Sequence, residues 1–421
     1  MKRRFKSEFV QNAVTLMSAT FVAQIFSYLL TPIITSLYTP EEAGQLGLFL
    51  RIIAVCSALA TLRYEYALPI VKNEGHAYRL YRLINRIVLV FSVFALLLLL
   101  IPVFTNGDSD TYIYYALMPI AIGLTARFNL QTNWSIRLKA IKKIGLSRMS
   151  NAIGSSLAKI GFAYLNCGYL GLIYGTIVGL FLANLSFFGL NKQFGTFKDK
   201  IGARNYLIAK GQKDFPFINL PHALMDFGRD LLIGILFFYY FSGAEYGLYD
   251  LSYRMLRLPL ILAGVSLSQV FFQRISEMIR EHQDIRPLVT KSMKLLVLIS
   301  LAPFSIIIFF GPDLFSFVFG ENWRVAGEYA QVMTPWFAMN FVISPISSIP
   351  MVIGRQKEFF KLAILGTTLM VGSLLFTQEV LDMPPTDALL VVSITQFAYL
   401  ILVMVRIFHF LNIHKAESLN D

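Results

Sequence analysis

The hydrophobic residues of this chain lie in long uninterrupted runs that are separated by short polar segments. One of them, VLVFSVFALLLLLIPV at 88–103, shows no period of two. Runs of about 20 apolar residues match a hydrocarbon core of about 30 Å, and lipid offers the backbone no hydrogen-bond partner, so each run must be helical. The pattern predicts an all-α membrane protein rather than a barrel, whose short strands alternate in polarity.

About twelve such spans can be marked along the chain. They are predicted at 11–37, 45–71, 84–104, 112–134, 148–166, 171–191, 214–241, 248–273, 290–311, 327–352, 360–377 and 388–410.

Composition supports the membrane class and excludes others. Of the 421 residues, 56% are hydrophobic and only 15% are charged, which is too little charge for a soluble protein of this length. The net charge of +12 does not indicate nucleic-acid binding, because the basic residues lie in short clusters between apolar spans, where membrane topology places them. We therefore expect membrane lipids around the chain and no nucleic-acid partner.

The polar segments alternate in charge along the chain. Segments such as KRRFK, SIRLKAIKKIGLSR and GRQKEFFK hold nearly all the loop lysines and arginines, and the intervening segments, such as YTPEEAG and TQEVLDMPPTD, hold one, Arg324. The positive-inside rule then predicts that both termini are cytoplasmic. The first span follows a basic N-terminus without a convincing cleavage site and is interpreted as an uncleaved signal anchor.

A weak internal repeat predicts two six-helix bundles, at 1–200 and 201–421. The segments YTPEEAGQLGLFLR and FSGAEYGLYDLSYR align Gly44 with Gly247 and Arg51 with Arg254. Two halves of the same orientation imply a pseudo-two-fold axis along the membrane normal, with substrate handled between them. Chance similarity of two short loops is the alternative.

Charged residues inside the predicted spans are the candidate functional residues, because a charge in the hydrocarbon core costs about 2.5–3.5 kcal/mol on insertion scales. The cations are Arg51, Arg63, Arg127, Lys159, Arg229, Arg254 and Arg257, and the acids are Glu65, Asp226, Asp230 and Asp250. Seven cations against four acids predict a cationic, water-filled cavity. A diphosphate would suit it, since arginine offers a rigid fork of donors to phosphate oxygens.

Helical spacing predicts two ion pairs, Asp226–Arg229 and Asp250–Arg254. Arg51 and Arg254 are expected near outer helix ends, where they could instead extend to the headgroups, and Arg127 toward an inner end has the same alternative. Arg63, Lys159 and Arg229 are expected nearer the middle of their spans.

The acids also have two interpretations. Asp226 and Asp230 are candidates for proton or cation coupling, and a structural ion pair with Arg229 is the alternative. Glu65 and Asp250 are the other coupling candidates.

Signals of catalysis and of bound cofactors are missing from the sequence. None of the histidines has metal-ligand spacing, and no phosphate-binding Walker loop occurs. We expect no metal and no cofactor. The outer segments are short, which argues against an enzyme with a large outer domain.

Four stretches resemble a known family. They are LRYEYALPI, DFPFINLPHALM, GAEYGLYDLSYRMLRLPLILAGVSLSQVFFQRISE and FGENWRVAGEYAQVMTPWFAMNFVISPISSIPMVIGRQ. They are similar to the polysaccharide flippases of the multidrug/oligosaccharidyl-lipid/polysaccharide (MOP) exporter superfamily, the Wzx-type O-antigen translocases. The resemblance is patchy but runs from the first span to the tenth.

The resemblance implies a MATE-like fold in which two six-helix bundles enclose a central cavity and alternate in access. It implies an undecaprenyl-diphosphate-linked oligosaccharide as cargo, an ion gradient or the membrane potential as the drive, and the bacterial inner membrane as the location. A polysaccharide polymerase and glycosyltransferases are possible partners. The alternatives are a drug or cation antiporter of the same fold, which predicts an acidic cavity, and a membrane-embedded glycosyltransferase or polymerase.

Overall fold

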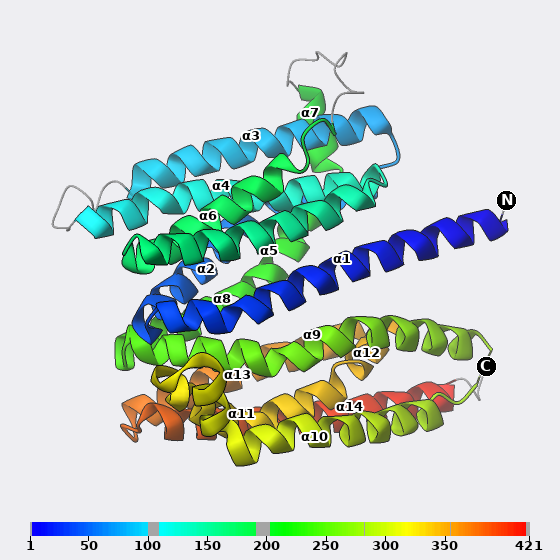
Figure 1. Cartoon of the computed structure of the whole chain (residues 1–421). Helices are drawn as coiled ribbons and strands as arrows, with labels where there is room; N and C mark the ends of the chain where they lie inside the picture. Colours follow the sequence, from blue (N-terminus) through cyan, green and yellow to red (C-terminus); the bar gives the residue numbers. More distant parts are fainter. Residues whose placement is uncertain (1, 100–108, 191–202, 282, 354, 418–421) are drawn as a thin grey trace. The chain divides into compact units, whose positions relative to one another are not determined.

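The protein is helical throughout the residues that its computed structural model describes, which are 2–99, 109–190, 203–281, 283–353 and 355–417 (Figure 1). Each of the twelve predicted spans overlaps a long helix, but the helix in 45–71 ends at Thr61, and the helix in 327–352 ends at Ile343 and is followed by two short helices. The ends of 84–104 and 171–191 lie outside the described residues. The predicted fold class, an all-α membrane protein, is confirmed.

The helices follow one another with short connections. In the first half they are α1 (Lys2–Leu37), α2 (Pro40–Thr61), η1 (Tyr64–Ala67), α3 (Glu74–Leu99), α4 (Ser109–Arg137), α5 (Ile141–Tyr164), α6 (Gly168–Leu185), α7 (Ala203–Lys210), η4 (Phe215–Asn219) and α8 (Leu220–Tyr240). In the second half they are α9 (Gly243–Arg280), α10 (Arg286–Phe319), η5 (Glu321–Trp323), α11 (Arg324–Ile343), η6 (Ile346–Ser348), α12 (Ile349–Val352), α13 (Gln356–Glu379) and α14 (Pro385–Glu417).

Eight of the described helices are long and apolar enough to cross a membrane: α1, α2, α3, α4, α6, α10, α13 and α14. The other long helices are α5, α8, α9 and α11, which contain more polar or charged positions. Among them, α5, α8 and α9 carry four of the seven predicted intramembrane cations, Lys159, Arg229, Arg254 and Arg257. The less hydrophobic long helices are therefore the ones that carry most of the candidate cations.

The chain divides into two compact units, Met1–Ile235 and Leu236–Asp421. The division falls within α8, because the segment before it packs with the first unit through contacts of α7 with α3 and of η4 with η1. The boundary that the sequence predicts, between positions 200 and 201, lies outside the described residues.

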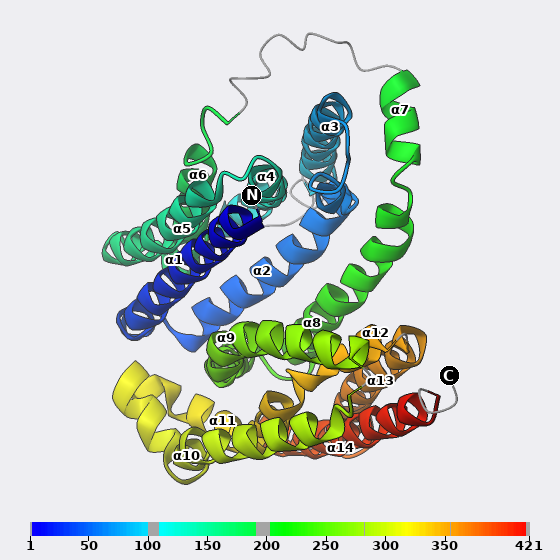
Figure 2. The same ribbon diagram turned by 90° about the vertical axis from the view of Figure 1, so that its right-hand side faces the viewer.

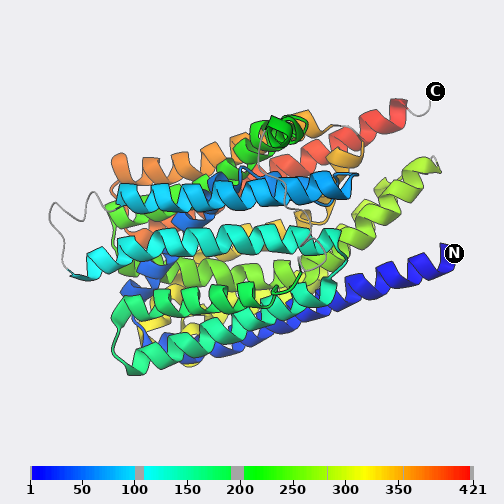
Figure 3. The ribbon, with the colours of Figure 1, turned by 90° about the horizontal axis from the view of Figure 1, so that it is seen from above.

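In the first unit, α4 is the central helix. It packs against α2, α3 and α6, and Figure 2, which looks along the helices, shows these three around it. Figure 3 shows α3 and α4 lying side by side over most of their lengths, and α5 lying beside α6. The buried side chains at the centre include Phe49, Ile84, Ile122, Leu130 and Trp134.

In the second unit, α11 has the corresponding role and packs against α9, α10 and α14. It approaches α10 closely where Gly327 lies against Gly311, because a Cβ at Gly327 would be 2.3 Å from the Gly311 carbonyl oxygen. Aromatic rings of α9, Tyr246, Tyr249 and Tyr253, are buried in this unit.

The predicted repeat coincides with a repeated helix start. Thr39 caps α2 and forms a capping box, in which its hydroxyl accepts from the Glu42 N–H and the Glu42 carboxylate accepts from the Thr39 N–H. At the offset that aligns Gly44 with Gly247, Ser242 accepts in the same way from the Glu245 N–H at the start of α9. Since a capping box fixes where a helix begins, Arg51 and Arg254 occupy equivalent positions on α2 and α9.

A row of glycines brings α5 and α6 into close contact. Gly171, Gly175 and Gly179 recur at every fourth position of α6, and a Cβ at Gly175 would lie 2.4 Å from the Lys159 Cγ and 2.7 Å from its backbone nitrogen. Small residues at this spacing let two helix backbones approach where no hydrophobic effect drives association. Tyr38, between α1 and α2, adds a hydrogen bond of 2.7 Å to the Lys159 carbonyl oxygen.

We predict that Gly175→Ala destabilises the protein by roughly 1–3 kcal/mol, because its Cβ would overlap the α5 backbone. Gly161→Ala, on α5, is the matched control, since nothing lies within 4 Å of the added Cβ and alanine favours helix by about 1 kcal/mol over glycine. Thermal unfolding of the purified proteins measures the difference. Equal melting temperatures for the two variants would contradict the close packing.

Candidate functional site

Two arginines of the first unit meet at one carboxylate between α2 and α8. The Arg51 Nη1 lies 3.7 Å from Asp230 Oδ2, and the Arg229 Nη2 donates to Asp230 Oδ1 at 2.9 Å. The Arg229 Nε donates to the same oxygen at 3.1 Å. The three side chains together carry a formal charge of +1, and all three are partly exposed. We call Arg51, Arg229 and Asp230 the arginine cluster.

The capping box at Thr39 decides how deep Arg51 lies. Because α2 begins at Pro40 rather than near position 45, Arg51 is the twelfth residue of a helix of 22. This is about 16 Å along the axis at 1.5 Å per residue, so the expectation that Arg51 lies near an outer helix end is wrong. Arg229 is the tenth residue of 21 in α8, in the middle of its helix as expected.

The ion pair of Arg229 that the structure describes is with Asp230, not with Asp226 as predicted from helical spacing. The Asp226 side chain is 57% exposed and lies 3.7 Å from His222, one turn earlier on the same helix. Asp230 is only 17% exposed and is also reached by Arg51. A less exposed carboxylate beside two guanidinium groups is the stronger partner, because the attraction between opposite charges is less screened away from water.

A second charged pair follows α2 directly. Leu62 and Arg63 both have left-handed backbone conformations, with φ of 50° and 58°, and this ends the helix at Thr61. The predicted span 45–71 therefore stops earlier than expected, and Arg63 lies beyond the helix rather than near its middle. Consecutive left-handed residues other than glycine are strained, and such strain is concentrated at functional sites.

The Arg63 guanidinium lies between a carboxylate and two aromatic rings. Its Nη1 is 3.7 Å from Glu65 Oε1, and its Cζ is 4.4 Å from the Tyr66 ring centroid and 5.8 Å from that of Phe227. The Phe227 contact connects this pair with α8, the helix of the arginine cluster. Tyr66 and Phe227 are site residues that the charge analysis missed, although the aromatic residues of RYEY were a visible signal.

Glu65 is the more deeply buried residue of the Arg63–Glu65 pair, with only 1% of its side chain exposed. Its Oε2 and the Arg63 Nε are buried without a hydrogen-bond partner among the described residues. Burial raises the pKa of the Glu65 carboxyl, although Thr61 and Arg63 act in the opposite direction. A buried acid of this kind, lying in η1 and outside the long helices, keeps its proton to a higher pH than an exposed carboxyl does, because its pKa is raised.

Long side chains from α4 and η1 fix this segment. Arg137, at the end of α4, donates to the carbonyl oxygens of Leu68 and Val71. The Tyr64 hydroxyl donates to the Ala209 carbonyl oxygen of α7 at 3.4 Å. These bonds hold η1 and the following turn in place where the left-handed residues interrupt the regular backbone.

The remaining predicted cations lie in other places. Lys159 packs on α6 through Gly175 and is five residues from the end of α5, so it is not near the middle of its helix as expected. Arg127 is exposed on α4 and lines a pocket with residues of α3 and α6. In the second unit, Arg254 Nε pairs with Asp250 at 3.0 Å, as predicted, and Arg257 lies over the Tyr253 ring at 5.4 Å.

The pH dependence of the stability of Glu65→Gln tests whether burial raises the pKa of the Glu65 carboxyl. Because burial raises its pKa, the protonated form is favoured in the folded protein. Its contribution to stability is complete at low pH and is lost as pH rises through the raised pKa. We predict that the melting temperature of Glu65→Gln, relative to the wild type, increases between about pH 5 and about pH 8.

The control for this experiment is Glu358→Gln, which removes a half-exposed carboxylate paired with Arg355. It should show no comparable increase over the same pH range. A Glu65→Gln difference that stays constant with pH would show that Glu65 titrates at the same pH in the folded and unfolded chains.

A protein-family model described as polysaccharide biosynthesis protein matches residues 33–328. The match covers α2 to α10, with the arginine cluster, the Arg63–Glu65 pair and Arg254. The chain belongs to this polysaccharide biosynthesis family. The resemblance found in the sequence is thereby confirmed at the level of the family. No curated protein matches the sequence.

Solved structures share the fold. An inward-facing multidrug resistance MATE family transporter of the MOP superfamily aligns with a TM-score of 0.72 at 15% identity, covering 96% of this chain and 99% of the other. The lipid II flippase MurJ, in an inward closed conformation, aligns with a TM-score of 0.67 at 16% identity, covering 95% and 90%. A MOP superfamily transporter from Pyrococcus furiosus, described as having a binding pocket of reverse polarity, aligns with a TM-score of 0.60 at 15% identity, covering 97% of this chain and 96% of the other.

At these identities the structural similarity establishes the fold and not the substrate. The polysaccharide biosynthesis protein is thus a multi-pass membrane protein with the fold of MOP superfamily transporters.

Proposed function

We propose that the protein is a flippase that moves a polyprenyl-diphosphate-linked oligosaccharide, such as an O-antigen repeat unit, from the cytoplasmic to the outer leaflet of the inner membrane. The observation that carries the proposal is the arginine cluster, in which two guanidinium groups from α2 and α8 share the Asp230 carboxylate. The family match supports a role in polysaccharide biosynthesis, and the fold supports transport by alternating access.

The chemistry of the cluster suits a diphosphate. Each guanidinium group has a planar fork of donors that matches two phosphate oxygens. Asp230 holds both groups in place beside one another. Together the side chains offer a diphosphate two adjacent forks and one positive charge in a setting of apolar helices, where electrostatic attraction is weakly screened.

The wider arrangement is part of the same proposal. Both termini would be cytoplasmic, and two six-helix bundles would be related by an axis along the membrane normal. Of the seven cations named from the sequence, six would contribute to a cavity for the sugar and diphosphate. The seventh, Arg127, lines a separate pocket. The cargo would be supplied by glycosyltransferases and extended by a polymerase.

Glu65 is the residue best suited to couple transport to a proton gradient. It is buried, one of its oxygens lacks a partner, and it lies beside Arg63, whose charge favours the ionised form. Asp230 and Asp250 each form a direct ion pair with an arginine, and Asp226 is largely exposed. A proton on Glu65 would release Arg63 for other partners.

A drug or cation antiporter of the same fold is the second candidate, and the structure gives it less support. Such a protein needs acidic side chains in excess, whereas the acids described between α2 and α8 each lie beside a basic side chain. A glycosyltransferase or polymerase remains the third candidate.

Replacing either arginine of the cluster tests the flippase proposal in cells. In a strain that depends on this protein, we predict that Arg51→Gln and Arg229→Gln each reduce surface polysaccharide at least tenfold and cause lipid-linked repeat units to accumulate on the cytoplasmic side. Losing a charged hydrogen-bonding partner for phosphate costs about 1.5–3 kcal/mol, or a factor of ten or more. Surface polymer and labelled lipid-linked intermediates are the two measurements.

Arg324→Gln is the matched control, because Arg324 forms an exposed ion pair of 2.7 Å with a single carboxylate, Asp313. It should leave the amount of surface polymer unchanged. Normal surface polysaccharide in both cluster variants, with protein present in the membrane, would refute the proposal.

A further inference from the structure

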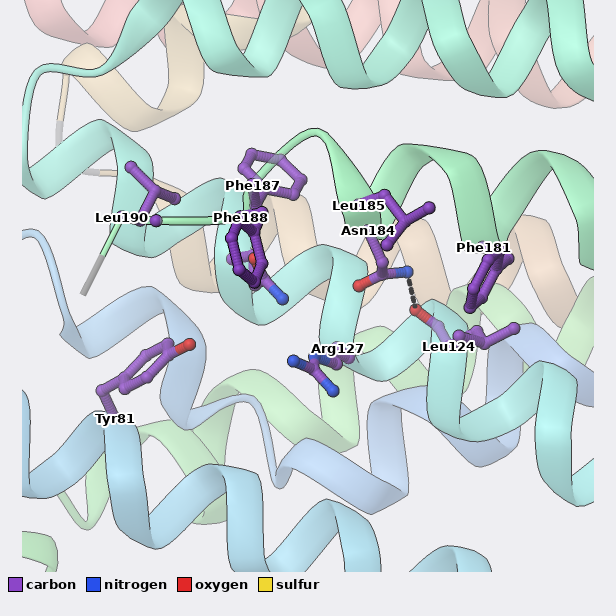
Figure 4. A pocket seen from close by; sticks show the side chains of 11 residues that line it. Tyr81, Leu124, Arg127, Phe181, Asn184, Leu185, Phe187, Phe188 and Leu190 are labelled. Atoms are coloured by element: carbon purple, nitrogen blue, oxygen red, sulfur yellow. Dashed lines mark hydrogen bonds between the residues drawn. The ribbon is translucent and has the colours of Figure 1, made fainter. Parts of the chain in front are cut away.

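The first unit contains a pocket that is separate from the arginine cluster. It has a volume of about 390 Å³ and is lined by residues of α3, α4, α6 and the turn after α6 (Figure 4). Its charged residue is Arg127, whose guanidinium group projects into the pocket in Figure 4. No ion pair or hydrogen bond joins that side chain to another residue in the part of the chain that the structure describes.

The polar groups of the pocket suit an anion. Gln131, one turn along α4 from Arg127, is 5% exposed. Asn184 donates to the carbonyl oxygens of Leu124 and Leu180, while its own Oδ1 is buried without a partner. Because both donors of Asn184 are used in this way and its Oδ1 is an acceptor, the groups that can donate to an anion are the exposed Arg127 guanidinium and the Gln131 amide. No carboxylate lines the pocket to compete with the anion.

The other walls are apolar and open. Phe181 is 52% exposed, Leu185 is 50% exposed and Phe188 is 81% exposed. Large apolar side chains exposed along a membrane helix are solvated by lipid chains rather than by water. The pocket thus combines a site for a phosphate with a surface for an acyl chain.

The depth of Arg127 matches a lipid headgroup. Arg127 is ten residues before Arg137, the last residue of α4, which is about 15 Å along the axis. Unlike α2, α4 has 29 residues, or about 43 Å, so it extends several ångströms beyond a hydrocarbon core of about 30 Å at each end, and Arg127 is closer to the interface than to the helix end. Tyr81, on the opposite wall, is seven residues from the start of α3, or about 10 Å. A long arginine side chain extends several ångströms toward the nearer interface. By the predicted topology, this interface is on the cytoplasmic side.

We propose that this pocket binds the phosphate of an anionic phospholipid of the cytoplasmic leaflet, with Arg127 as its ligand and one acyl chain along Phe181, Leu185 and Phe188. The site goes beyond the flippase function and does not depend on the cargo. A volume of about 390 Å³ is at the small end of ligand pockets, and walls with few polar groups do not suit an oligosaccharide. A free phosphate would gain nothing from the apolar surface.

Lipid binding to the purified full-length protein tests the proposal. Native mass spectrometry would measure the affinity for phosphatidylglycerol, for phosphatidylcholine, for inorganic phosphate and for undecaprenyl diphosphate. We expect phosphatidylglycerol to bind the wild type at least tenfold more tightly than phosphatidylcholine, and Arg127→Gln to lose this preference. Lys142→Gln should keep it, because Lys142 is an exposed cation at the start of α5 that does not line the pocket.

A second variant separates binding from folding. Leu185→Trp leaves Arg127 in place and fills the groove with a larger side chain at a half-exposed position, so it should also weaken phosphatidylglycerol binding. An unchanged preference for phosphatidylglycerol in Arg127→Gln, or none in the wild type, would overturn the proposal. Equal binding of inorganic phosphate, or a loss of undecaprenyl diphosphate affinity in Arg127→Gln as large as its loss of phosphatidylglycerol affinity, would overturn the assignment of the pocket to a phospholipid. None of these results would alter the surface-polymer test of the flippase proposal.

Discussion

The contact of two arginines with the Asp230 carboxylate is the interaction on which this account depends. Hydrocarbon does not solvate a charge, so each charged side chain on these helices needs either a counter-charge or water. Arg51 and Arg229 come from helices that are far apart in the sequence, and both find the same carboxylate. The contact joins α2 to α8 and at the same time places two guanidinium groups side by side. If each arginine had its own carboxylate, both charges would be neutralised within the membrane. No net positive charge would then remain for a ligand.

The two copies of the repeated segment show how the arginine cluster differs from an ion pair formed within one helix. The capping box at Thr39 and the bond from the Glu245 N–H to the Ser242 hydroxyl start α2 and α9 at equivalent positions, so Arg51 and Arg254 are equivalent in position. Arg254 has an aspartate one turn earlier on its own helix, Asp250, at 3.0 Å. The residue at the corresponding position of α2 is Gly47. Without a local acid, Arg51 relies on α8, and a duplicated structural position has become part of a shared site.

The sequence was sufficient to predict the helices, because the apolar runs are long and their ends are polar. The depth of single residues was harder to predict, since it depends on local backbone details. A capping box moved the start of α2 toward the N-terminus, which placed Arg51 in the middle of the helix. Two left-handed residues, Leu62 and Arg63, ended the same helix early. Neither has a side chain that favours this conformation, so the residue types did not predict that α2 would end there.

Partners were predictable only within one helix. The Asp250–Arg254 pair follows from spacing alone and is present, whereas Arg229 pairs with Asp230, which Arg51 also reaches, rather than with Asp226. The Arg127 pocket was equally hidden, because its walls come from three helices and are mostly apolar. Tertiary packing decides such contacts, and a single sequence does not contain the distances between helices.

The most direct test of the account is the affinity of the purified protein for undecaprenyl diphosphate, compared with undecaprenol, which lacks the diphosphate. The account predicts tight binding of the diphosphate, weak binding of the alcohol, and at least a tenfold loss of diphosphate affinity when Arg51 and Arg229 are both replaced by glutamine. Equal affinity for the two lipids, or undiminished diphosphate binding by the double variant, would contradict the claim that the arginine cluster recognises an anionic cargo.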